Sequence, residues 1–350
     1  MAGLGVEGRL EAILDEFPVD VSSTEVVDMH GLDGARMYEV DLGSGLMPAD
    51  LGVNACYILD SEAGMRVACH PHLVGAELAE LCVDCAVDFR AALGGLGLIA
   101  DGGYAILNIL RGSSGYRVSE ASPNDTPVIN VRTEYSEDGY RAHSDDSRRV
   151  RVTYSDLDSR GLGAPSTLII PDTFATGRSA EATLTHLFGE GVEPERVVLY
   201  GFTAIPALER LGLLCAGWGV ELVSFSVCDI TQLASNHYDM PVYGLDESLW
   251  ESSGELRRLG SIIDVETLRR FMPRYIAGLD QPGDWSERHL DLFDGAGVVS
   301  GDVAGHLRKS IGLVESLVCL NSGQPWYDGW HGEIAEAELG RLREALLGYS

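Results

Sequence analysis

Between residues 104 and 227 the chain alternates short apolar runs with segments of helical periodicity, and this alternation constrains the fold most. Consecutive Val, Ile and Leu residues are typical of strands that are buried on both faces of a parallel sheet. Helices are predicted near 179–190 and 205–215. The runs predicted as strands are 105–110, 128–132, 167–170, 196–201 and 221–227. We therefore expect an α/β fold, with a mostly parallel sheet and helices on both faces.

The flanking regions differ in character from this central part. Residues 1–65 contain short apolar runs between Gly and Asp turns, which predict a β-rich N-terminal extension. We assign residues 66–295 to the α/β domain, with a polar helical insertion near 244–270. Residues 296–350 are rich in Glu, Leu and Ala, and they predict a helical C-terminal tail.

Charge and composition exclude several classes of partner. The formal net charge is −29, and the only notable basic cluster is Arg148, Arg149 and Arg151, so we expect no nucleic-acid partner. Gly, Asp or Arg interrupts every apolar run well before about 20 residues, so we expect no membrane partner. Seven cysteines and an N-terminus without a signal-like apolar segment predict a cytoplasmic protein with reduced thiols.

The run from Thr167 to Leu184 predicts an anion-binding turn between a strand and a helix. Free amides at a helix start carry partial positive charge, and Gly177 allows an anion to approach closely. The residues expected to hold the anion are Ala175, Thr176, Gly177, Arg178 and Ser179. Asp172, at the strand end, would be repelled by a phosphate unless it met sugar hydroxyls or a metal ion. The pair therefore predicts a sugar phosphate as the ligand.

This segment resembles the loop that binds 5-phosphoribosyl 1-pyrophosphate (PRPP) in type I phosphoribosyltransferases. That pattern is four apolar residues, two acids, three variable residues and then Thr-Gly-x-Thr/Ser, and Thr176, Gly177 and Ser179 match its end. Pro171 departs from the pattern, because it stands where most members have the first acid. The uracil phosphoribosyltransferases have Asp-Pro there, so the chain is most similar to them with the two residues exchanged.

The apolar strand from Tyr104 to Leu110 ends in a second motif, Arg-Gly-Ser-Ser-Gly. It resembles the pyrophosphate loop of the same family, in which uracil phosphoribosyltransferases have Leu-Arg-Ala-Gly. The resemblance assigns Arg111, Gly112 and Ser113 to pyrophosphate binding. A planar guanidinium beside backbone amides can bind two phosphate oxygens at once.

The charged segment from Ile129 to Leu157 predicts two polar strands joined by a hairpin. Its position between the two motifs is similar to the mobile lid of the family, which excludes water from the reacting sugar. The lid candidates are Arg132, Arg148 and Arg149. The alternative is an exposed hairpin with paired charges.

Two segments are similar to the part of uracil phosphoribosyltransferases that recognises the base. In the run Arg274–Trp285 the resemblance assigns the backbone amides of Ile276 and Ala277 to the uracil carbonyls. A carboxylate, with Asp284 as the candidate, or a backbone carbonyl would accept from the uracil N–H group. The earlier run Asn236–Glu247 fits the same pattern in part, so the assignment of this region stays open.

A zinc site is the main metal alternative. The donors Cys69, His70, His72, Cys82 and Cys85 are close in sequence, and Cys-x-x-Cys is a common ligand spacing. Cys82 and Cys85, however, would lie one turn apart on an amphipathic helix, where small buried thiols are ordinary core residues. We therefore do not expect zinc.

The resemblance implies an enzyme that transfers the 5-phosphoribosyl group from PRPP, with Mg²⁺, to a nitrogen heterocycle, a uracil-like base first. Asp172 and Arg111 would be the catalytic residues, no side chain is assigned to the metal, and a homodimer or higher homo-oligomer is implied. One alternative is a protein that senses PRPP or nucleotides without turnover. Another is an α/β scaffold that only assembles through its helical tail.

Overall fold

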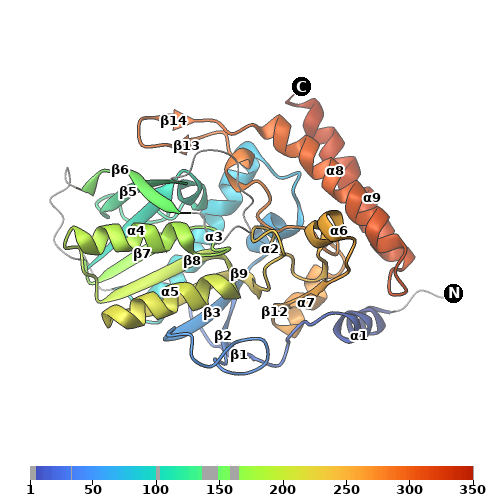
Figure 1. Cartoon of the computed structure of the whole chain (residues 1–350), viewed down its shortest axis with the longest axis horizontal. Coiled ribbons are helices and arrows are strands. Elements are labelled where there is room, and N and C mark those ends of the chain that lie inside the picture. The colour runs from blue at the N-terminus through green and yellow to red at the C-terminus, as the bar shows by residue number, and fades with distance from the viewer. Residues whose placement is uncertain (1–4, 33, 100–102, 136–148, 158–164, 350) are drawn as a thin grey trace.

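The computed structural model describes residues 5–32, 34–99, 103–135, 149–157 and 165–349. Its main sheet combines strands from the first half of the chain with strands from the centre (Figure 1). The strands of this sheet are β1 (Thr24–Val27), β2 (Arg36–Val40), β3 (Ala55–Asp60), β4 (Tyr104–Leu110), β5 (Val128–Tyr135), β6 (Val150–Ser155), β7 (Thr167–Pro171), β8 (Arg196–Ala204), β9 (Glu221–Thr231) and β12 (Ser261–Ile262).

The spatial order is β1-β2-β3-β9-β8-β7-β4-β5-β6, with β12 paired to β9. The six strands from β3 to β5 in this order run parallel to their neighbours, while β1, β2, β6 and β12 pair antiparallel. The expectation of an α/β fold with a mostly parallel sheet is therefore confirmed. The central strands β4, β7 and β9 are almost entirely buried, as expected for parallel strands that are covered on both faces.

Helices cover both faces of the sheet, as predicted. The helices are α1 (Val6–Glu16), α2 (Glu62–Cys69), α3 (Gly75–Gly95), α4 (Arg178–Gly189), α5 (Ile205–Trp218), α6 (Glu247–Ser253), α7 (Val265–Phe271), α8 (Val303–Ser322) and α9 (Gly329–Leu347). One apolar core joins Phe89 of α3 to Tyr200 and Phe225 on the sheet, and their rings stack or meet edge-on. The other core joins Leu184 of α4 and Leu208 of α5 to the opposite face.

The two ends of the chain attach differently to this sheet. Strands β1 to β3 extend the sheet itself, so the N-terminal region shares its sheet with the central domain, and it also carries the unpredicted helices α1 and α2. At the other end, α8 and α9 pack along each other, at the right of Figure 1. The boundaries proposed at 65 and 295 stay predictions. Every helix among the described residues is too short or too polar to cross a lipid bilayer.

The region near 244–270 is only partly helical. Helices α6 and α7 lie within it, but β11 (Arg258–Leu259) and β12 lie between them. Strand β10 (Gly244–Leu245) precedes α6 and pairs antiparallel with β11. A second small pair, β13 (Leu292–Phe293) with β14 (Val298–Val299), precedes α8. Strand β12 pairs with Ile230 and Thr231 at the end of β9, and β13 contacts the turn that follows β4, so both lie near the edge of the sheet where the parallel strands end.

Candidate functional site

The turn between β7 and α4 lines a cavity at the carboxyl end of the parallel strands. The cavity has a volume of about 280 Å³, and its wall includes every residue from Asp172 to Ala180. Helix α4 begins at Arg178, so the first-turn amides of this helix belong to the predicted anion-binding residues. Gly177, at the N-cap position, has no side chain that could accept hydrogen bonds from those amides. The turn therefore has the geometry of an anion site at a helix start.

Gly177 is required here for a different reason than the sequence argument gave. Its φ of +74° lies in the left-handed region, which glycine adopts without strain. A Cβ atom at this position would lie 3.3 Å from Cα of Ala207, on helix α5. The glycine thus allows the turn to bend and α5 to pack against it. The expectation that its missing side chain leaves room for the anion stays a prediction.

Asp172 lies in the cavity wall directly after the buried strand β7. Its Oδ1 atom accepts a hydrogen bond from the Thr173 amide at 2.9 Å. Burial raises the pKa of this carboxyl to about 7, and the Thr173 bond only partly opposes that rise. Gly201 makes the position possible, since a Cβ there would lie 2.0 Å from the Asp172 carbonyl oxygen. The carboxyl can thus change its charge near neutral pH at the edge of the anion site.

Arg111 and Gly112 reach the same cavity from the end of β4. The peptide bond between Leu110 and Arg111 is cis. A Cβ on Gly112 would lie 3.5 Å from Oδ1 of Asp172, so the two motifs meet closely. The Arg111 guanidinium forms an ion pair with Glu287, and both side chains are about one-third exposed. A bound anion must therefore share Arg111 with Glu287 or displace it.

A second cavity, of about 370 Å³, adjoins the first and shares Arg111, Gly112 and Asp172 with it. Residues 282–287 form its other wall, together with Tyr238. The Trp285 indole N–H donates to the Gly112 carbonyl oxygen at 3.0 Å, which fixes that wall against the Arg111 turn. Asp284 also lines this cavity and forms an ion pair with Lys309 at 2.8 Å. Groups from both proposed loops and from the proposed base segment thus line two adjoining cavities that share part of their walls.

Other predicted site residues are not brought to this space. Ser113 is buried, and its Oγ accepts a hydrogen bond from the Ile109 amide at 2.8 Å instead of facing the cavity. Ile276 and Ala277 are buried in the core, and the Ala277 carbonyl oxygen accepts from the Asn321 side chain at 2.8 Å. Neither lines the two cavities. The prediction that their amides meet the base therefore has no support in the geometry.

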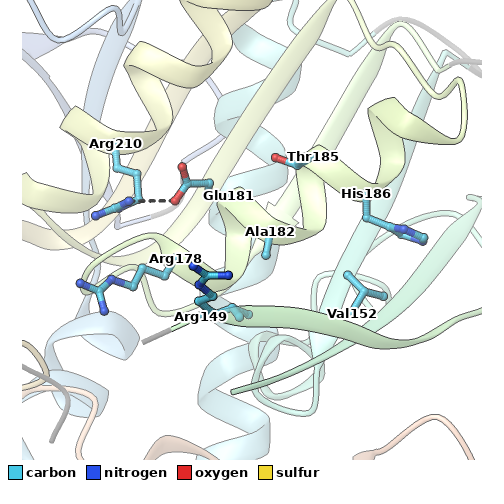
Figure 2. Close-up of a pocket in the computed structure, with 9 residues that line it drawn as sticks. Arg149, Val152, Arg178, Glu181, Ala182, Thr185, His186 and Arg210 are labelled. Carbon is cyan, nitrogen blue, oxygen red and sulfur yellow. Dashed lines mark hydrogen bonds and ion pairs between the residues drawn. The ribbon is translucent and has the colours of Figure 1, made fainter. Parts of the chain in front are cut away.

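The lid candidates occupy three different situations. The segment 129–157 does form an antiparallel pair, β5 with β6, as predicted. Arg132 is exposed and lies 3.7 Å from Glu134 in an ion pair, and it does not line either cavity. Arg148 lies outside the described residues. Arg149 lines a wider cavity of about 840 Å³ over the outer side of α4, together with Arg178 and Arg210 (Figure 2).

The sequence-based zinc candidates divide into two groups. Cys82 and Cys85 are buried, and burial raises the pKa of the Cys82 thiol to about 12, which opposes the thiolate that zinc needs. His70 and His72 instead meet the buried Glu338 of α9, with Nδ1 atoms 3.0 Å and 2.5 Å from its carboxylate oxygens. Arg341 also pairs with Glu338 at 2.9 Å, so this carboxylate already has three cationic or hydrogen-bonding partners.

Sequence reasoning missed several residues of the cavity wall. Tyr238, Ser286 and Glu287 had no assigned role, and Trp285 was only the end of a similar segment. The partial match at Asn236–Glu247 was the signal that could have found Tyr238. Both candidate base segments contribute residues to the wall, so the geometry does not choose between them.

Comparison with models of protein families and with curated protein sequences gives no match to this chain.

Proposed function

We propose that the chain is a phosphoribosyltransferase of type I architecture, which transfers 5-phosphoribosyl from PRPP to a nitrogen heterocycle and releases pyrophosphate. One observation carries the proposal. The turn 175–179 with Asp172 and the Arg111–Gly112 turn come from two separate segments of the chain and line the same cavity. Each of the two segments carries its own sequence motif.

The cavity supports a distinct role for each group. The amides of 175–179 would bind the 5-phosphate, because they start helix α4 and carry partial positive charge. Asp172 would accept hydrogen bonds from the ribose hydroxyls and stabilise the positive charge that develops on the sugar. Arg111 would exchange Glu287 for the pyrophosphate oxygens, since a guanidinium fork fits a diphosphate well.

The reaction then needs mainly positioning. The bond from C1 of the ribose to the pyrophosphate oxygen breaks, and its electron pair leaves with pyrophosphate. A ring nitrogen of the acceptor forms the new bond to C1, and the acceptor N–H proton must be taken up by a base or water. Asp172, with a pKa of about 7, can hold a proton or a negative charge at the ribose at neutral pH.

The donor set of this cavity fits Mg²⁺, which prefers carboxylate, phosphate and water oxygens. Asp172, Asp284 and Glu287 contribute carboxylates to the wall. When bound with PRPP, the ion would neutralise negative charge on the departing pyrophosphate.

The acceptor would occupy the space bounded by Trp285 and Tyr238. Aromatic walls favour a flat ring, and the Asp284 carboxylate can accept from a ring N–H. A uracil-like base stays the first choice, although the amides proposed to read its carbonyls lie elsewhere. Backbone groups of 282–286 are the alternative donors, because this segment lines the cavity.

A second candidate is a protein that binds PRPP or a nucleotide without turnover. Two observations favour it. Pro171 lies in the buried strand, where it supplies no carboxylate beside Asp172. In addition, the ion pair of Arg111 with Glu287 opposes the use of Arg111 by pyrophosphate.

The proposal is tested by measuring pyrophosphate release from Mg²⁺-PRPP with a panel of pyrimidine, purine and pyridine bases. We expect release with one class of base and none with Asp172→Asn. Parallel calorimetry with PRPP separates the alternatives. Binding without release for any base supports the sensor, and absence of both PRPP and nucleoside monophosphate binding contradicts the assignment of the site.

A further inference from the structure

The C-terminal helix α9 places a charged side chain against the turn between α2 and α3. Glu338 lies on α9 next to the buried Leu339, and its side chain is only 1% exposed. Glutamate is rarely this buried unless its carboxylate has specific partners. Two of its partners are the imidazoles of His70 and His72, which lie 268 and 266 residues earlier in the chain. We call His70, His72 and Glu338 the His–Glu cluster.

The donor atoms of the His–Glu cluster lie close together. Nδ1 of His70 lies 3.0 Å from Oε2 of Glu338, and Nδ1 of His72 lies 2.5 Å from Oε1. One ligand atom from each of the three residues lies within 4.8 Å of the other two. Two ligand atoms that each lie about 2.1 Å from a tetrahedral ion are about 3.4 Å apart. Each histidine contact with Glu338 would therefore lengthen by less than about 1 Å to admit an ion.

The three side chains can exchange their hydrogen bonds for bonds to an ion. In the hydrogen-bonded cluster each Nδ1 carries a proton that points at the carboxylate. A neutral imidazole can hold its proton on Nε2 instead, and its Nδ1 lone pair then binds a metal. The ion would thus take the place of two N–H hydrogens between the same three residues. The imidazoles of His70 and His72 are 14% and 18% exposed, so an ion can reach them from solvent.

Buried donors fix the backbone that carries the two histidines. Arg288 donates to the His70 carbonyl oxygen at 3.1 Å and to the Leu73 carbonyl oxygen at 3.2 Å. Nε2 of the buried His306 donates to the Pro71 carbonyl oxygen at 2.9 Å. A metal site binds tightly when surrounding hydrogen bonds hold its ligands in position, and this turn meets that condition.

Arg341 orients the carboxylate of the cluster and limits the kind of ion that fits. Its Nε and Nη2 lie 3.0 Å and 2.9 Å from Oε2 of Glu338, so Oε1 is the oxygen that would bind the ion. Because Arg341 already balances the charge of Glu338, a bound cation adds positive charge. Such a site disfavours Mg²⁺ and Ca²⁺, which need several oxygen ligands, and favours an ion that bonds well to neutral imidazole nitrogen.

We propose that His70, His72 and Glu338 bind a divalent transition-metal ion, with Zn²⁺ as the first choice and water as the fourth ligand. Two histidines and one carboxylate are a donor set that Zn²⁺ and Fe²⁺ use in proteins. The ion would join α9 to the turn between α2 and α3 and so stabilise the packing of the C-terminal helix. This set differs from the one considered from the sequence, because Glu338 takes the place of the thiols.

The proposed metal site is independent of the proposed function. None of its three residues lines the three cavities described above. A protein that binds neither PRPP nor a nucleotide could still bind the ion here, and the reverse also holds. The two proposals therefore fail separately.

The test is a titration of chelator-treated protein with Zn²⁺, followed by calorimetry and by thermal unfolding. We expect one equivalent to bind at the cluster. The Tm should rise by about 3–4 °C when free Zn²⁺ exceeds its Kd about a hundredfold, and Mg²⁺ or Ca²⁺ should give no comparable rise. His70→Gln and His72→Gln should each bind Zn²⁺ at least about a hundredfold more weakly, since each removes a direct ligand. The Gln amide can still donate to Glu338, so both variants keep a hydrogen bond that supports the fold.

His186→Gln is the matched control, because His186 is also partly exposed but lies on α4. It should bind Zn²⁺ within about twofold of wild type. X-ray absorption of the Zn²⁺-loaded wild type needs no variant to fold, and it should show nitrogen and oxygen ligands at about 2.0–2.1 Å. Sulfur ligands at about 2.3 Å would overturn the proposal. Equal Zn²⁺ affinity in wild type, His70→Gln and His72→Gln, or a Tm that Zn²⁺ does not raise, would overturn it as well.

Discussion

Asp172→Asn should make the ligand-free protein more stable at neutral pH while it weakens ribose binding. Burial raises the pKa of the Asp172 carboxyl from 3.8 to about 7. Between these values the folded state holds a proton that the unfolded state has released, so this group lowers stability as the pH rises. This rise in the pKa corresponds to a loss of at most about 4 kcal/mol in the free energy of unfolding. Asn keeps the oxygen that accepts from Thr173 but stays neutral, and it removes this penalty.

The assay is chemical unfolding of both proteins at intervals from pH 4 to pH 8. The free energies of unfolding should agree near pH 4, diverge as the pH rises and stop diverging above about pH 7. Asp229→Asn is a matched comparison, because burial also raises the pKa of Asp229 to about 7, but Asp229 does not line the cavities. The free energy of unfolding of Asp229→Asn should change with pH as that of Asp172→Asn does, but Asp229→Asn should bind PRPP as tightly as wild type.

Asp172→Asn, in contrast, should bind PRPP about tenfold to a hundredfold more weakly, because an ionised acceptor is lost from the ribose site. A difference in stability between wild type and Asp172→Asn that stays constant from pH 4 to pH 8 would refute the argument from burial. Unchanged affinity for PRPP would refute the assignment of Asp172 to the ribose.

Three further substitutions test separate contacts. Gly177→Val should lower the stability of the fold by about 1–3 kcal/mol and should also weaken phosphate binding, because it strains a residue in the left-handed region against α5. Thermal unfolding measures the first effect, and titration with phosphate measures the second. Arg111→Ala should weaken pyrophosphate binding by at least about tenfold and nucleoside monophosphate binding much less, and equal losses in calorimetry would contradict its role. Glu338→Gln should reduce stability by about 3 kcal/mol, since it removes a buried carboxylate that contacts His70 and His72. If urea unfolding shows the same free energy of unfolding as wild type, these contacts do not stabilise the packing of α9.

The parallel core of this fold could be predicted because its strands are long apolar runs. The runs ending at Leu110 and Pro171 lie within a residue of their predicted ends, and parallel pairing brings their following turns to one edge. Helix α1 was not predicted, because it fully buries only Leu10 and Ile13, while Val6 is exposed, Leu14 is partly buried and the other positions are polar or small. Tertiary contacts, which the local pattern does not encode, stabilise such a helix.

The far wall of the site could not be predicted from local signals. Trp285 and Glu287 belong to a short 3-10 helix, Trp285–Arg288. Its last residue, the buried Arg288, donates to carbonyl oxygens of α2 and the following turn and so fixes its position. The sequence has no periodic pattern that would predict such a contact. Ile276 and Ala277 show the reverse case. The resemblance assigned their amides to the base, but in the structure both residues are buried and pack against α8.

A crystal structure of the protein with PRPP and Mg²⁺ tests the central claim most directly. We predict the 5-phosphate within hydrogen-bonding distance of the amides of 175–179, the ribose hydroxyls at Asp172, and Arg111 turned from Glu287 to the pyrophosphate. PRPP bound elsewhere, or a 5-phosphate that contacts none of these amides, would contradict it.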